Sequence, residues 1–313
     1  NTNFKIGRQK LNTPLAGADD ARMLPNLFEA GVSHYTGFEN TTLMLMHVTQ
    51  MTVGTFGNVY GTPSAANGLT IQSGYGLGYK LATSGNFAEM GDVALGAGAD
   101  TDGVTAGAVI YKGIENLSLQ AWNYYAHDIL NAVYLQADYG FDVSSLKMKA
   151  SAQYINQTDV GDSLAGDVKG NYWAAKLGTS YGALSGYVAY SQTLDDDSTA
   201  GYGIITPWGG MPAFTQGMVT RHQFFNDTNT WKVAGTYKLN ELLGADVKAS
   251  AYYVEFDVGD ATYAANTTSK ESGFDIQYQA TKDLNLRFRG NFPTDFAPGT
   301  DWDEYRLIAN YNF

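Results

Sequence analysis

The sequence predicts an all-β protein, a transmembrane antiparallel up-and-down β-barrel, and three observations support this fold class. Extended segments of about ten residues alternate apolar and polar side chains. The connections between them are alternately short and long. Tyr and Phe gather near the segment ends and predict an aromatic girdle at the headgroup level, as at Tyr124-Tyr125, Tyr252-Tyr253, Tyr237 and Tyr311. Residues 1–313 form a single predicted domain, because no Pro- or Ser-rich linker and no change of composition divides the chain.

Alternation is clearest in the C-terminal segment, residues 304–313. Tyr305, Leu307 and Tyr311 share one face, while Arg306 and Asn310 fall on the other. In a membrane barrel the apolar face meets lipid and the polar face meets a water-filled lumen. The same pattern occurs in residues 146–154, 231–239, 247–253, 274–280 and 284–292.

The connections sort into two classes by length. The short ones are residues 37–40, 113–116, 141–145, 182–183, 240–245 and 281–283. The long ones are residues 11–26, 53–103, 158–169, 194–229, 259–270 and 293–303. Counting backward from a periplasmic C-terminus puts every short connection inside and every long one outside, over about fourteen strands. Glycine-rich residues 70–98 leave room for one further hairpin in the longest connection.

Composition excludes several classes of protein. No run of about 18 apolar residues could span a membrane as a helix. The net charge of -12 argues against a nucleic-acid partner, since binding phosphates requires clustered Lys and Arg. Zero Cys excludes disulfides and thiol chemistry. No secretory signal precedes Asn1, so we expect a mature chain or one without its beginning.

No catalytic site, metal site or cofactor is predicted, and we expect no enzyme activity. A barrel hydrolase using His127 beside Asp128 is the weaker alternative, because no nucleophile can be identified. No metal-ligand spacing links the four histidines, which are His34, His47, His127 and His222.

Several motifs resemble the OprD-type outer-membrane porin family. Residues 20–31 resemble the family's stretch of Arg, two apolar residues, Pro, a spacer, Phe-Glu and Gly, and an alternating strand follows at 41–49. Residues 283–289 and 304–308 resemble the family's two closing strands. Residues 207–212 resemble a loop element that precedes a strand opening on Trp.

The resemblance implies a porin in the outer membrane of a Gram-negative bacterium, in contact with outer-membrane lipid and lipopolysaccharide. The family's barrels have eighteen strands, so the chain would match their C-terminal three quarters, and either N-terminal strands are missing from it or it forms a smaller barrel. The expected solutes are small and anionic or zwitterionic, such as amino acids or small organic acids with a carboxylate. The oligomeric state stays open between a homotrimer and a monomer.

The resemblance also implies a ladder of cations on the lumen wall, and the alternating segments supply candidates. Opposite the apolar faces lie Lys147, Lys149, Lys176, Lys232, Lys238, Lys248, Arg287, Arg289 and Arg306. We favour the three arginines, because guanidinium binds carboxylate through two parallel hydrogen bonds. Alternatively, these cations pair with wall carboxylates such as Asp275 and Glu304 and only stiffen the barrel.

Residues 11–26 are the predicted constriction loop, folded into the lumen. Pro14 and Pro25 would fix its turns, and its acidic pair would oppose the basic wall and create a transverse field. An ordinary exposed loop is the alternative. The predicted constriction residues are Asp19, Asp20 and Arg22.

The sequence therefore favours a passive, moderately selective porin. A barrel with a mainly structural or adhesive surface role is the alternative, since the long loops would suit surface contacts too. Conductance in planar bilayers discriminates the two, because a plugged structural barrel would give no steady channel.

Overall fold

The computed structural model describes residues 1–18, 24–55, 80–81, 83, 85–195, 203–210, 212–259, 267–296 and 299–312. The strands are β1 Thr2–Gln9, β2 Leu27–Tyr35, β3 Thr41–Thr52, β4 Ala88–Glu89, β5 Val104–Ile114, β6 Leu117–Ala126, β7 Leu130–Val143, β8 Leu146–Asp159, β9 Lys169–Tyr181, β10 Leu184–Thr193, β11 Thr228–Lys238, β12 Val247–Val258, β13 Thr267–Gln279, β14 Leu284–Thr294 and β15 Glu304–Tyr311. The helical segments are α2 Met90–Leu95, the 3-10 turn η1 His222–Phe224 and α3 Asn240–Leu243. No helix among these residues is long and apolar enough to cross a membrane.

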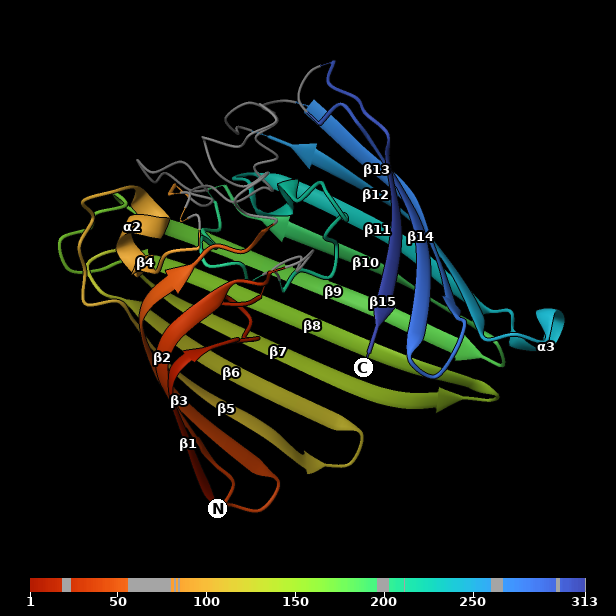
Figure 1. Ribbon diagram of the computed structural model, residues 1–313, viewed down its shortest axis with the longest axis horizontal. Helices are drawn as coiled ribbons and strands as arrows, with labels where there is room; N and C mark the ends of the chain where they lie inside the picture. Colours follow the sequence, from red (N-terminus) through yellow and green to blue (C-terminus); the bar gives the residue numbers. More distant parts are fainter. Residues whose placement is uncertain are drawn as a thin grey trace.

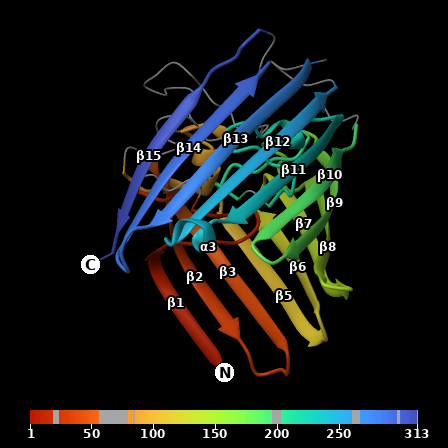
Figure 2. The same ribbon diagram turned by 90° about the vertical axis from the view of Figure 1, so that its right-hand side faces the viewer.

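The strands form one 15-stranded sheet in which successive strands are antiparallel neighbours, with β4 paired to β3 off the main path. The predicted up-and-down order is therefore confirmed. The sheet is curled and its strands are tilted (Figures 1 and 2). Within the described residues no pairing joins β1 to β15, so the sheet has two edges.

The two faces of the sheet differ as the alternation predicts. Exposed apolar side chains cover the outer face, including Ile6 and Leu307, each 86% exposed. Side chains one position away point to the inner face and are buried, such as Val254 and Phe256 on β12. An outward apolar face beside a covered inner face is the arrangement of a barrel in lipid.

Short and long connections lie at opposite ends of the sheet with one exception, since residues 127–129 join β6 to β7 at the end of the long connections and are short. Tight turns at the short end place Asn40, Asn116 and Ser144 at φ of 54°, 60° and 56°. Asn adopts this left-handed region more readily than most residues. One short connection forms the single helical turn α3, which lies far from α2 at the loop end (Figure 1).

Three segments of the long connections fold into the concave side of the sheet. Ala16 bridges Trp208 and Gly209, so the segment after β1 meets the segment before β11. The Trp208 indole Nε1 donates to the Met90 carbonyl oxygen of α2 at 3.0 Å. Together with inward side chains of β2, β3 and β5 to β9, these segments make the main apolar core.

The outer aromatic residues only partly follow the prediction. Tyr125, Tyr237 and Tyr311 are exposed on the outer face, but Tyr124 is fully buried on the inner face and Tyr252 also points inward. Adjacent residues of a strand point to opposite faces, so neither tyrosine pair could lie wholly in an outer girdle. Near the loop end, outer aromatics instead bond polar side chains on the next strand, as Tyr190 to Asn229, Trp173 to Gln192 and Trp231 to Glu255.

The longest connection also differs from the prediction of an added hairpin. Its described part contains the two-residue strand β4 and the helix α2. Residues 56–79 lie outside the described residues.

Candidate functional site

All nine cations of the predicted ladder lie on the inner face of the sheet. On β14, Arg287 and Arg289 share a face with the buried Asn291, while Leu286 and Phe288 are exposed on the other. The same alternation sets the inward direction of Lys147 and Lys149 on β8, Lys176 on β9, Lys232 and Lys238 on β11, Lys248 on β12 and Arg306 on β15.

Three of these lysines form a lower tier at the turn ends of their strands: Lys147, Lys238 and Lys248. Lys238 and Lys248 face each other in register across β11 and β12, where like charges repel. Among the described residues no carboxylate oxygen lies within 4.0 Å of any of the three ammonium groups. Asp142 is the register partner of Lys147 across β7 and β8, so the positive charge without a facing carboxylate in the described residues is that of Lys238 and Lys248.

An upper tier lies nearer the loops and comprises Lys176, Lys232 and Arg289. Lys176 and Lys232 are both register partners of Ala189, so they stand two strands apart, about 10 Å. The Arg289 side chain is 8% exposed. Unlike the lower tier, all three contact an infolded segment.

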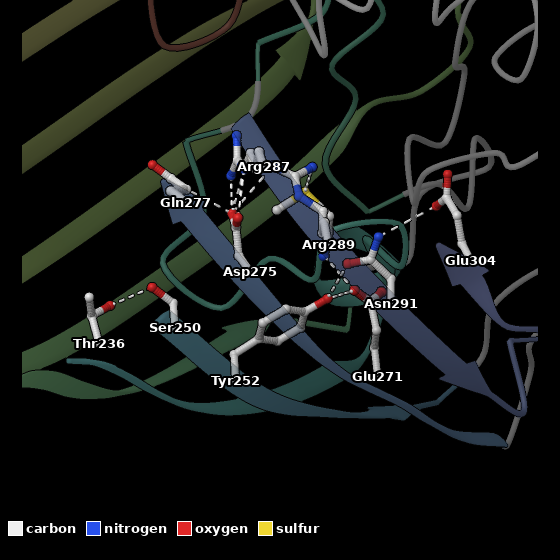
Figure 3. A network of polar contacts seen from close by, with 11 residues as sticks. Thr236, Ser250, Tyr252, Glu271, Asp275, Gln277, Arg287, Arg289, Asn291 and Glu304 are labelled. Carbon is white, nitrogen blue, oxygen red and sulfur yellow. Dashed lines mark hydrogen bonds and ion pairs between the residues drawn. The ribbon is translucent and has the colours of Figure 1, made fainter. Parts of the chain in front are cut away.

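Arg287 and Arg289 converge on one carboxylate, that of Asp275 on β13 (Figure 3). The Arg287 Nε lies 2.7 Å from both carboxylate oxygens, and Nη2 also donates to Oδ2. The Arg289 Nη2 lies 3.7 Å from Asp275 Oδ2. Charge-assisted bonds of this kind fix the orientation of the guanidinium planes on the wall.

Arg306 pairs with Glu304 two residues away on the same face of β15. Its Nε donates to Oε1 at 2.5 Å and its Nη2 donates to Oε2 at 3.0 Å. Asp275 and Glu304 are the two wall carboxylates named as alternative partners, so ion pairing does occur at all three favoured arginines. Pairing of this kind stiffens the wall and leaves the guanidinium groups at the inner face.

A hollow of about 880 Å³ lies at the turn ends of β5 to β8. Its lining includes Lys147, Lys149 and Asp138, whose Oδ1 lies 3.0 Å from the Lys149 Nζ. It also includes Lys112 on β5, which sequence reasoning missed. The alternation of residues 104–114 could have revealed this tenth inward cation, because Ala106 and Ala108 are buried on the same face.

Residues 212–221, which we call the inner strap, cross the inner wall. On β8 the Gln153 amide donates to the Pro212 carbonyl at the start of the strap. On β9 the Lys176 Nζ lies 4.2 Å from the Phe214 ring centroid. The Lys232 Nζ on β11 donates to the Gln216 carbonyl oxygen at 2.5 Å. Arg289 on β14 approaches the Met218 Sδ at 3.1 Å. The strap therefore covers the upper tier.

The predicted constriction loop is partly described. Residues 11–18 do fold inward, with Leu15 and Ala16 almost fully buried. At the far end of the loop the Asn26 amide donates to the Gly17 carbonyl at 3.0 Å and accepts from the Gly54 amide at 2.8 Å. Asp19, Asp20 and Arg22 lie outside the described residues, so the acidic face and its field stay a prediction.

Two of the histidines meet on the outer face. The Thr105 hydroxyl lies 2.9 Å from His47 Nδ1 and 3.0 Å from His127 Nε2. The sequence placed these histidines on separate segments, and strand pairing brings them together. In the part of the chain that the structure describes, no three His, Asp or Glu side chains gather as a metal site would require.

His222 is fully buried in the loop before β11. Its ring stacks on Phe225 at 4.8 Å and contacts Phe296 at 4.7 Å. Its Nδ1 lies 3.0 Å from the Ser269 hydroxyl oxygen. Because the Ser269 hydroxyl donates its own hydrogen to the Asp295 carbonyl, it accepts from His222, so the proton of the neutral ring is on Nδ1. Burial lowers the pKa of His222 from 6.5 to about 3, so the ring is neutral at physiological pH.

Comparison with known proteins gives one family. A family model described as outer membrane porin, OprD family, matches residues 1–313. No curated protein sequence matches significantly.

Solved structures with a similar fold come from Pseudomonas aeruginosa. OccK9 (OpdG) superposes with a TM-score of 0.78 at 19% identity, covering 99% of this chain and 73% of its own. OpdK with vanillate gives 0.79 at 16% identity, covering 99% and 74%. OccK2 (OpdF) in complex with glucuronate gives 0.77 at 19% identity, covering 99% and 77%. At these identities the likeness shows the fold.

Proposed function

Because this chain belongs to the OprD family of outer-membrane porins, we propose that it carries small solutes bearing a carboxylate, such as amino acids or small organic acids. In this proposal the Lys and Arg of the inner wall form a ladder that attracts the anionic group. The solute would move passively between the strap and the opposite wall and on past the lower tier.

The observation that carries this proposal is the lower tier. Lys147, Lys238 and Lys248 face inward at the turn ends, and no described carboxylate lies within ion-pair distance of them. The chain as a whole has a net charge of -12, so a group of inward lysines with no described ion pair within 4.0 Å, two of which face each other, differs from the average charge of the chain. Such a patch raises the local concentration of anions.

The arginines add a second kind of recognition. Arg287 is held by Asp275 through Nε and one terminal nitrogen, and 27% of its side chain is exposed. A guanidinium has five N–H donors, so a guanidinium bound to the wall can still donate to a passing carboxylate. Two neighbours in the fold were crystallised with vanillate and glucuronate, which both carry a carboxylate.

The test measures reversal potential in asymmetric KCl across planar bilayers. Neutralising the lower tier with Lys147→Gln, Lys238→Gln and Lys248→Gln is expected to lower the ratio of chloride to potassium permeability several-fold. Lys270→Gln is the matched control, because Lys270 lies on the outer face beside Glu255 at 4.0 Å. In addition, benzoate is expected to reduce the chloride current of the wild type, and benzyl alcohol is not.

An unchanged permeability ratio in the triple variant would show that the ladder does not select anions. An equal block by benzoate and benzyl alcohol would show that the carboxylate is not what the lining recognises.

The structural or adhesive alternative has one observation in its favour, the filling of the concave side. Large side chains such as Trp208, Tyr124 and Phe28 are completely or almost completely buried there. If purified protein gave no steady conductance at all, the plugged barrel would become the better account.

A further inference from the structure

Glu271 on β13 is a completely buried carboxylate whose main partners come from the inner strap. The backbone amide of Met218 donates to Oε1 at 2.7 Å, and the amides of Val219 and Thr220 donate to Oε2 at 3.1 and 2.6 Å. The Tyr252 hydroxyl donates to Oε1 as well (Figure 3). Three successive backbone N–H groups around one anion form a nest, which offsets the cost of burying the charge.

The strap fits this carboxylate closely. A Cβ built at Gly217 would lie 2.7 Å from the Glu271 Oε2 and 2.5 Å from the Thr220 carbonyl oxygen, closer than real Cβ atoms approach. Only glycine leaves room for the backbone to approach the carboxylate at this point. The strap end is therefore shaped to the wall at Glu271.

Elsewhere the strap is held by single contacts, of which the hydrogen bond from the Lys232 ammonium to the Gln216 carbonyl is charged. At β9 the contact is a lysine over the Phe214 ring, and at β10 the Ser191 hydroxyl meets the Thr215 hydroxyl at 2.6 Å. At β14 the Arg289 guanidinium meets the Met218 sulfur, a weak acceptor. Charged hydrogen bonds are roughly twice as strong as neutral ones, so the cluster at Glu271 dominates the attachment of this end.

The strap and a solute compete for the same cations. Lys232 donates to the Gln216 carbonyl and Arg289 contacts Met218, so both upper-tier groups are engaged by the strap. If the strap were released from the wall, these groups would become accessible from the lumen, and the passage between the strap and the opposite wall would change in width. Attachment at Glu271 thus controls both the width of the passage and the number of cations that a solute can reach.

We propose that Glu271 is the positioning residue that clamps the inner strap to the wall and so sets the aperture and the accessible charge of the upper tier. The proposal rests on the proposed channel function for its effect on conductance. The clamping itself is a property of the fold and is measured separately.

The first measurement is thiol labelling. The chain has no Cys, so Val219→Cys introduces a single thiol at a side chain that is 1% exposed. Adding Glu271→Gln replaces one acceptor oxygen by an NH₂ group that faces backbone donors. Because release of the strap exposes this position, we expect a small thiosulfonate to label the introduced thiol at least tenfold faster than in Val219→Cys alone. The matched control is Glu255→Gln, since Glu255 lies on the outer face and bonds Trp231 and Tyr253.

The second measurement is single-channel recording without the added Cys. Glu271→Gln is expected to change the single-channel conductance and to increase current noise and the preference for anions. Loss of a negative charge alone would also raise anion preference, so Asp275→Asn serves as the charge control. Among the described residues Asp275 bonds Arg287, Arg289 and Gln277 of the wall, and its variant is expected to change selectivity without accelerating labelling.

Gly217→Ala provides a second route to the same state if Glu271→Gln folds poorly, as judged by the β-sheet circular dichroism signal. It pushes the strap away from Glu271 while leaving the carboxylate in place. Faster labelling with an altered conductance in either variant supports the clamp. Unchanged labelling in both variants overturns it, as does faster labelling with wild-type conductance. If the wild type forms no channel, the proposed function fails, while labelling still decides whether Glu271 holds the strap.

Discussion

The inner face of β2 to β7 packs mainly apolar side chains against infolded loops, whereas the inner face of β8 to β15 carries most of the inward lysines and arginines. On the first wall, Phe28, Val48 and Tyr124 are fully buried in the main core, which extends onto β8 and β9. Beyond β9 the described apolar cluster is small and joins Val254, Phe256 and Val258 of β12 to Phe225. All nine predicted ladder cations lie on the second wall.

This asymmetry separates two tasks within one sheet. Apolar burial stabilises by about 25 cal/mol per Å², so the first wall can hold the infolded loops without charged groups. The second wall bonds the inner strap through polar groups at a few points, such as Glu271 and Lys232. We infer that the first wall anchors the infolded loops and that the second wall lines the passage of the proposed channel.

The largest expected effect comes from breaking the anchor at Trp208. Its side chain is 2% exposed and bonds α2 through Nε1. Trp208→Ala should cost about 3–5 kcal/mol of loop docking, because it leaves a cavity and an unpaired carbonyl. Trypsin should then cut after Arg221, which is 2% exposed in the intact protein, and single-channel conductance should rise.

The matched control is Trp231→Ala, since Trp231 is 43% exposed on the outer face. It should leave Arg221 resistant to trypsin. If Trp208→Ala were equally resistant and conducted like the wild type, the first wall would not be the anchor.

A smaller effect is expected on the second wall at Arg287. Arg287→Gln removes the main partner of Asp275 and leaves a partly buried carboxylate facing the lumen. Chloride permeability relative to potassium should fall a few-fold, because that carboxylate repels anions. Adding Asp275→Asn should restore most of the ratio. If the double variant stayed as low as Arg287→Gln alone, the lost guanidinium itself would be what the solute needs.

Most of the fold could be predicted because the direction of the side chains in a strand repeats every two residues. The pattern at Tyr305, Arg306 and Leu307 sets outward and inward faces with no knowledge of distant contacts, and the same rule gives the inward direction of the cations. Even the pairing of Arg306 with Glu304 follows from two positions on one face of a strand.

The inner strap could not be predicted in the same way, because its contacts join residues far apart in sequence. Trp208 meets α2, and Thr220 meets Glu271, through docking that no local pattern encodes. One signal was present in the connection before β11: Ile204, Ile205 and Trp208 are too apolar for an exposed loop. A partner for such residues had to lie inside the barrel.

The smallest expected effect is a pH dependence of the loop packing around His222 on the second wall. Its pKa is lowered to about 3 by burial, so protons bind the opened loop from about pH 6.5 downward and the packed loop only near pH 3. Packing is therefore fully favourable above pH 6.5 and is lost as pH falls, with the opened population rising up to tenfold per pH unit. Current noise recorded between pH 6.5 and 4.5 should increase accordingly. His222→Gln does not titrate and should remove that increase, whereas an equal rise of noise in both proteins would assign the effect to carboxylates of the lining.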